Sequence, residues 1–292
     1  MIPTLHPATA GGGLSLSEYV QLAARNGFIG VEYSIEAVAE FAQQTSFADA
    51  AAIFESNKVL PIVFGLPVEW RKDEATFEAG LERLPALAKF AQDLDTTRCC
   101  TYVLPDGGVP AAEYAERSVQ RFVRIGEVLQ EQGVRFGLEF IGPAHFRTDP
   151  ENVWFYDIPG ALQVVATVAE RGKLENIGLL VDSFHWHTSN GSAMDLASIP
   201  IQQIVHVHVN DAPNVPREQQ QDGVRLLPGT SGVIDIEAFL KTLEAIGYDG
   251  PVSVETFSDD LRALPAEEAA TRAATAMRQI FERTDITPVR LV

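Results

Sequence analysis

The chain has 292 residues, of which 46% are apolar and 21% are charged, so it can bury a hydrophobic core without disulfides and is not expected to be disordered. Its 40 acidic and 22 basic residues give a formal net charge of −18, which argues against nucleic acid as a partner because the chain would repel a phosphate backbone. It has no long apolar run, no basic leader segment and no thiols besides the adjacent Cys99 and Cys100, which predicts a cytoplasmic protein with no membrane partner.

Short apolar runs alternate with stretches of helical periodicity, a pattern typical of a parallel sheet with crossover helices. Eight runs predict strands, and 292 residues divided by eight leave about 36 per unit, close to what each unit of a (β/α)8 TIM barrel requires. No linker-like segment divides the sequence, so we predict an α/β protein with one TIM barrel domain over residues 1–292. The predicted strands are residues 2–6, 30–33, 60–64, 99–104, 135–140, 177–182, 204–209 and 252–256.

Helix start signals lie between these runs. Ser15 or Ser17 is expected to cap the first long helix, and Asp235 the helix that precedes the last strand. Ser46 and Asp49 resemble a capping box with Asp in the place of Glu.

Four polar residues stand near the ends of consecutive predicted strands, and alternation turns each of them inward. Outward apolar residues flank Glu139, Asp182, His208 and Glu255 in their strands. Because the carboxyl ends of barrel strands meet at one face, these four side chains should lie together. Any one of them alone can be a solvated strand-end residue, but four in successive strands favour a shared site.

Three carboxylates at one place repel each other unless they are protonated or share a cation. A divalent metal therefore explains the set most simply. Oxygen-rich ligation with one imidazole favours Mn²⁺, or Mg²⁺ or Co²⁺, over zinc.

Other inward or strand-end residues leave more than one interpretation open. In the seventh predicted strand, alternation turns Val205 toward the helices and His206 inward, one layer below His208, where we expect it to pack or to support the metal ligand. Glu32 and His6, near the ends of the second and first strands, are either substrate contacts or rim residues.

Five short motifs lie in or after the predicted strands: Gly-Leu-Glu-Phe at 137–140, Leu-Val-Asp-Ser-Phe-His-Trp at 180–186, Val-His-Val-Asn-Asp at 207–211, Leu-Leu-Pro-Gly at 226–229 and Gly-Pro-Val-Ser-Val-Glu at 250–255. Together they resemble the xylose isomerase-like TIM barrel superfamily of sugar isomerases and epimerases, with inosose isomerase-like members closest. The resemblance covers essentially the whole chain and implies that Glu139, Asp182, His208 and Glu255 bind the metal and that the two glutamates handle the substrate proton.

The resemblance and the positions of single residues near the strand ends predict further contacts with the substrate. His185, in the Asp-x-x-His motif, is expected in a loop beside a substrate hydroxyl, and Trp186 beside it can stack on a sugar. Asp211 either orients His208 or a substrate group, or is an ordinary turn residue. The remaining candidates are His145, as an extra acid or base, and Arg217 and Arg225, which compete for the basic position that family members place beyond the metal histidine.

We therefore expect a metal-dependent isomerase or epimerase of carbohydrate metabolism that moves a proton next to a carbonyl through an enediolate. The alternative is a metal-dependent dehydratase or lyase on a keto-sugar, inosose or oxidised glycoside, for which His145 would matter more. A repair endonuclease is disfavoured by the acidic charge and by six histidines, too few for a zinc cluster, and a sugar-binding protein without catalysis is disfavoured by the complete quartet. The expected partners are a small sugar or cyclitol and a second copy of the chain.

Overall fold

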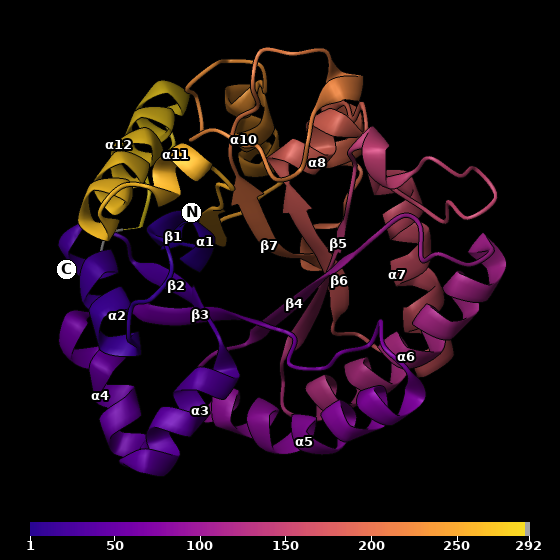
Figure 1. Cartoon of the computed structure of the whole chain (residues 1–292), viewed down its shortest axis with the longest axis horizontal. Helices are drawn as coiled ribbons and strands as arrows, with labels where there is room; N and C mark the ends of the chain where they lie inside the picture. Colours follow the sequence, from indigo (N-terminus) through magenta and orange to yellow (C-terminus); the bar gives the residue numbers. More distant parts are fainter. Residues whose placement is uncertain (290–292) are drawn as a thin grey trace.

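Eight parallel strands pair in sequence order and β1 also pairs with β8, so the sheet closes on itself in this computed structural model, which describes residues 1–289 (Figure 1). The predicted TIM barrel is confirmed. The strands are β1 (Ile2–Leu5), β2 (Gly30–Tyr33), β3 (Leu60–Gly65), β4 (Arg98–Val103), β5 (Arg135–Phe140), β6 (Ile177–Asp182), β7 (Ile204–Val209) and β8 (Pro251–Val254).

Helices follow the strands around the outside of the barrel (Figure 1). The α-helices are α1 (Pro7–Ala10), α2 (Leu16–Arg25), α3 (Ile35–Gln44), α4 (Phe47–Asn57), α5 (Glu74–Asp93), α6 (Ala111–Glu131), α7 (Ile158–Gly172), α8 (Ser183–Thr188), α9 (Ala193–Ala197), α10 (Ile236–Ala245), α11 (Asp259–Arg262) and α12 (Ala266–Thr284). Three short 3-10 turns are η1 (Ala144–Phe146), η2 (Ile201–Gln203) and η3 (Arg217–Gln219). Among residues 1–289, none of these helices combines the length and the apolar character needed to span a bilayer.

The predicted helix starts are confirmed with one refinement. Ser15, not Ser17, caps α2 in a complete capping box, and Asp235 accepts the N–H of Ala238 at the start of α10. Ser46 caps α4, but Asp49 accepts a bond from the Ser46 hydroxyl rather than from its backbone N–H. Only half of the capping box therefore forms at α4, whereas Asp195 completes one with Ser192 at the start of α9.

The hydrophobic core has two parts. The larger part lies between the strands and the helices, and a small separate cluster contains Cys100, Leu180 and Val205. A Cβ added to Gly137 would lie 2.7 Å from Cys100 Sγ and 3.1 Å from Val205 Cβ, so a glycine is needed where these residues converge. The prediction that Val205 faces the helices is therefore wrong, because the β6–β7 pairing shifts by one residue there and His206 pairs with Leu180.

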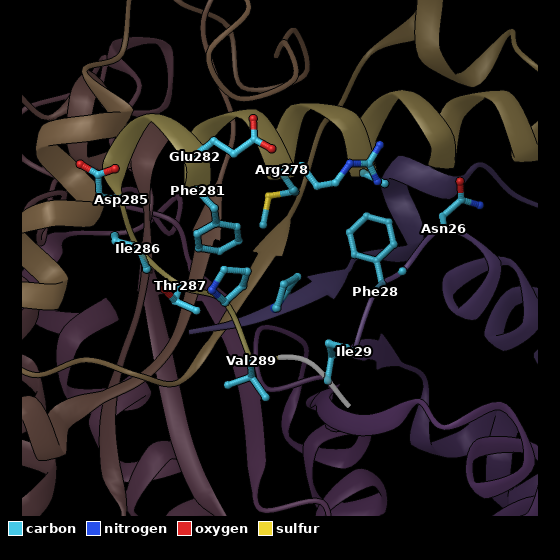
Figure 2. Close-up of a pocket in the computed structure, with 15 residues that line it drawn as sticks. Asn26, Phe28, Ile29, Arg278, Phe281, Glu282, Asp285, Ile286, Thr287 and Val289 are labelled. Carbon is cyan, nitrogen blue, oxygen red and sulfur yellow. The ribbon is translucent and has the colours of Figure 1, made fainter. Parts of the chain in front are cut away.

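The C-terminal part of the chain lies beside the amino ends of β1 and β2. Val289 N–H donates to Met1 O at 2.9 Å, which places the two ends of the described chain side by side. Beside this contact lies a cavity of about 510 Å³, into which Phe28 and Ile29, just before β2, and Phe281 of α12 project (Figure 2). The cavity lies at the amino end, opposite the end at which the predicted site residues gather.

Candidate functional site

Glu139, Asp182, His208 and Glu255 converge at the carboxyl end of the barrel. One ligand atom from each lies within 4.8 Å of every other, and all four side chains are buried. His208 Nδ1 is 3.4 Å from Glu255 Oε2 and 3.7 Å from both Asp182 Oδ2 and Glu139 Oε1. The parallel register produces this arrangement, since Asp182, the last residue of β6, pairs with His208 of β7.

Two of the converging atoms are buried without a hydrogen-bond partner, namely Glu139 Oε1 and His208 Nδ1. The other ring nitrogen of His208, Nε2, lies 2.9 Å from Glu32 Oε1. Because a carboxylate only accepts, Nε2 carries the ring proton and, in the neutral ring, the free lone pair of Nδ1 faces the three carboxylates. An acceptor lone pair, buried oxygens and a carboxylate behind the imidazole fit a divalent metal ion.

Burial and charge separate the two glutamates. Burial raises the pKa of Glu139 well above its ordinary value, and the charge of Glu255 raises it further. Burial also raises the pKa of Glu255, but the charges of His208 and Arg225 outweigh it and lower that pKa far below its usual range. For His208, burial lowers the pKa, but Glu32 and Glu255 outweigh it and raise that pKa well above its ordinary value.

Within residues 1–289, Arg225 is the only arginine that forms ion pairs with the quartet. Its Nη1 donates to Glu255 Oε2 at 2.6 Å and to Asp182 Oδ2 at 3.1 Å, while its Nη2 donates to Asp222 Oδ1 at 2.7 Å. Its competitor Arg217 is exposed and bonds Asn190 instead. Of the two predicted basic residues, the structure thus brings only Arg225 to the quartet.

His185 lies in helix α8, not in a loop as expected. Asp182 Oδ1 accepts the N–H groups of Phe184 and His185 at 2.6 and 3.1 Å, so the same aspartate caps α8 and faces the cluster. His185 Nε2 lies 3.7 Å from Glu139 Oε1. A Cβ on Gly142 would lie 2.4 Å from His185 O, so the approach of the loop after β5 to α8 requires glycine.

The predicted substrate contacts Trp186 and Asp211 serve the protein's own structure. Trp186 Nε1 donates to Ser192 O at 3.1 Å, and its ring packs on Phe239 with centroids 5.4 Å apart. The carboxylate of Asp211 accepts four backbone N–H groups, from residues 212, 231, 232 and 234. For Asp211 these bonds favour the turn-residue alternative, and the burial of Trp186 against Phe239 does not support its predicted contact with a sugar.

His145 lies after β5, as predicted. It lies in η1 with its ring 4.1 Å from that of Phe146, centroid to centroid. Its role as an acid or base stays a prediction.

Sequence reasoning missed two supporting residues and left a third undecided. Asn210 Nδ2 donates to Asp182 Oδ2 at 3.0 Å, and Asp222 holds Arg225. Glu32 Oε1 lies 2.9 Å from both His206 Nε2 and His208 Nε2, so it supports the histidines. Asn210 follows His208 by two residues, and extending the alternation of β7 by one step would have identified it.

The model of the xylose isomerase-like TIM barrel family matches residues 20–280. The inosose isomerase of Halalkalibacterium halodurans is 25% identical over 262 residues, which cover 89% of each protein. The 3-dehydroshikimate dehydratase of Pseudomonas aeruginosa is 28% identical over 215 residues, which cover 70% of this chain and 30% of that protein.

Among solved structures, that of IOLI protein with a binding zinc atom aligns with a TM-score of 0.80, covering 97% of this chain and 99% of that one. At 23% identity this likeness shows the fold.

Proposed function

This chain belongs to the xylose isomerase-like TIM barrel family, and on that premise we propose that it is a divalent-metal-dependent isomerase or epimerase of a keto-sugar or keto-cyclitol. Its similarity to an inosose isomerase along 89% of both chains supports a cyclitol ketone as the first substrate class to test. The proposed chemistry is transfer of a proton from a carbon next to the carbonyl.

One observation carries the proposal. Buried Glu139 Oε1 and His208 Nδ1 have no hydrogen-bond partner and lie 3.7 Å apart, with Asp182 and Glu255 completing the set. Leaving such atoms unpaired costs about 1–3 kcal/mol each, so they favour a bound cation that completes them. Glu139, Asp182, His208 and Glu255 would hold it.

The identity of the ion is part of the proposal. Oxygen-rich ligation favours Mn²⁺, Mg²⁺ or Co²⁺. The zinc bound by the structurally similar IOLI protein argues the other way, so zinc belongs in the same test as manganese.

A bound divalent ion supplies a Lewis acid that stabilises negative charge on the substrate oxygen as the proton leaves. Glu139 of β5 and Glu255 after β8 approach the cluster from different parts of the ring, so one can remove the proton and the other can return it. Arg225 holds Asp182 and Glu255 in place through the two bonds of Nη1. His185, beside Glu139, is the proposed contact for a substrate hydroxyl, which would replace the contact of its Nε2 with Arg225 Nη2 at 3.2 Å.

A dehydratase is the second candidate, and it is favoured by the similarity to a 3-dehydroshikimate dehydratase over 70% of this chain. Both reactions begin with removal of a proton beside a carbonyl. They differ in whether a β-substituent then leaves, and under this alternative His145 would be a candidate acid for the leaving group.

The test is to load the protein with Mn²⁺ or Zn²⁺ and incubate it with a panel of ketoses, inososes and 3-dehydroshikimate in heavy water, following exchange by NMR. Deuterium at the carbon beside the carbonyl, with an isomeric product, supports the isomerase. Release of water identifies the dehydratase. Metal binding without exchange on any compound contradicts both.

A further inference from the structure

His6 stands at the carboxyl end of the barrel, between β1 and α1. Its Nδ1 accepts the backbone N–H of Ala8 at 3.1 Å, so the ring caps α1. A neutral imidazole carries one proton, and an accepting Nδ1 leaves that proton on Nε2. A backbone contact at the start of α1 therefore sets the tautomer of His6.

The Nε2 of His6 faces the quartet. It lies 3.3 Å from Glu255 Oε1 and 3.9 Å from Glu32 Oε2. Its ring stands edge-on to that of His208, with centroids 5.4 Å apart. The side chain is 20% exposed, whereas that of Glu255 is 8% exposed, so His6 lies on the more open side of the cluster.

The two oxygens of Glu255 have different neighbours. Oε2 faces the cluster, 3.4 Å from His208 Nδ1 and 2.6 Å from Arg225 Nη1. Oε1 faces His6. A carboxylate that binds a cation through one oxygen keeps the other for a proton, and Oε1 is the oxygen so placed.

We propose that His6 is a positioning residue for Glu255, whose Oε1 its Nε2–H holds in the orientation that meets the substrate proton. The inference rests on the proposed function, in which Glu255 transfers that proton. The ring would then have two roles, since the tautomer that caps α1 also leaves the Nε2 proton on the nitrogen that lies 3.3 Å from Glu255 Oε1.

A second reading of the same residues is a further metal site, because His6, Glu32 and His208 also offer ligand atoms within 4.8 Å of one another. The contacts favour the positioning role. His208 Nε2 is already bonded to Glu32 Oε1 at 2.9 Å, and a metal there would have to replace its proton. Metal stoichiometry separates the two readings.

Two substitutions separate the two tasks of the ring. In His6→Asn, the amide oxygen can still cap α1, since Asn is a favoured N-cap residue, but the side chain is too short to reach Glu255. In His6→Gln, the longer amide can carry an N–H toward Oε1. Wild type and both variants are compared by kcat, KM, melting temperature and calorimetric titration with Mn²⁺.

We expect His6→Asn to lower kcat by about 10- to 100-fold, because misplacement of a reacting group costs on that order, with KM and Mn²⁺ affinity within about twofold of wild type. His6→Gln should recover part of kcat. A His6→Asn protein with wild-type kcat overturns the proposal. So does binding of two Mn²⁺ ions per wild-type chain and one per His6→Asn chain.

An NMR measurement tests the contact between His6 and Glu255 independently of catalytic activity. In the metal-free protein labelled with ¹⁵N, the His6 ring should show its proton on Nε2, and Glu255→Gln should shift the Nε2 resonance while leaving Nδ1 nearly unchanged. A proton on Nδ1, or an Nε2 resonance unaffected by Glu255→Gln, overturns the inference. Failure of the wild type to exchange any substrate contradicts the proposed function instead.

Discussion

The two ends of the barrel hold their charged side chains in different surroundings. At the amino end, Arg98 Nε donates to Val205 O at 3.0 Å and Arg135 Nη2 donates to Ile204 O at 2.9 Å, so these guanidinium groups bond the backbone. At the carboxyl end, Glu139 Oε1 and His208 Nδ1 stay unpaired. Bonded polar groups stabilise a fold, while unpaired ones cost energy that a ligand can recover.

The cavity described above does not coincide with the candidate site. The cavity of about 510 Å³ in Figure 2 lies at the amino end and is lined largely by apolar side chains such as Phe28, Met277 and Phe281. The quartet instead lies where Arg225 fills the space between carboxylates. Convergence of polar atoms, rather than open volume, therefore identifies the candidate site.

The largest effect should come from the proton-transfer residues of the carboxyl end. Glu139→Gln and Glu255→Gln, measured separately, should each lower kcat by about 10²- to 10⁴-fold, the usual contribution of a general acid or base. Both variants should fold, as judged by circular dichroism. Wild-type turnover in either would remove that glutamate from the proposed mechanism.

Arg225→Met should destabilise the metal-free protein by about 3 kcal/mol or more, because Asp182 and Glu255 would lose a buried cation. Denaturant unfolding with and without Mn²⁺ measures this, and the loss should shrink when the ion is present. Arg217→Met is the matched control, since Arg217 is exposed. Equal effects of the two substitutions would contradict the placement of Arg225.

At the amino end, Phe281→Ala should lower the free energy of unfolding by about 3 kcal/mol, because Phe281 is 3% exposed and its loss enlarges a cavity. Its Mn²⁺ affinity and its kcat, measured well below the melting temperature, should match wild type. A changed metal affinity would show that the two ends are coupled.

Metal affinity should rise with pH. The pKa values of His208 and Glu139 are raised in the metal-free protein, so each group keeps its proton to a higher pH than an ordinary side chain and must release it to bind an ion. Affinity should therefore rise by up to about 100-fold per pH unit below both pKa values and level off above them. Calorimetry in buffers of different ionisation enthalpy counts the released protons, and a count of zero would contradict these protonation states.

The smallest of these effects should come from substitution of Glu32, which bonds the ring nitrogen of His208 that faces away from the quartet. Glu32→Gln keeps an acceptor for His208 Nε2 but removes the charge, and should weaken Mn²⁺ binding by about tenfold. Glu40→Gln, at an exposed position of α3, is the control. Unchanged Mn²⁺ affinity in Glu32→Gln would show that the charge of Glu32 does not support metal binding by His208.

Much of the site follows from the sequence because strand alternation is local. Period-two patterning turned Glu139, Asp182 and His208 inward, and parallel strands carry inward residues to one end. The same reasoning placed Val205 on the wrong face, since a one-residue register shift between strands is not visible in one strand's pattern.

The loops were harder to predict. Arg217 and Arg225 are equivalent as sequence, and only the packing of the loop after β7 brings the second against Asp182, 43 positions away. Trp186 and Asp211 looked like substrate contacts because they neighbour motif residues, yet their polar groups bond Ser192 and the loop backbone at residues 231–234.

The sequence by itself determined the barrel and the convergence of the quartet, because both depend on the short-range periodicity of apolar and polar residues. The tertiary structure alone decided which distant side chains pair, as with Arg225 and Asp182, His208 and Glu32, or His6 and Glu255. Such pairs depend on the orientation of loops and rings across the barrel mouth, and no pattern of neighbouring residues encodes that orientation.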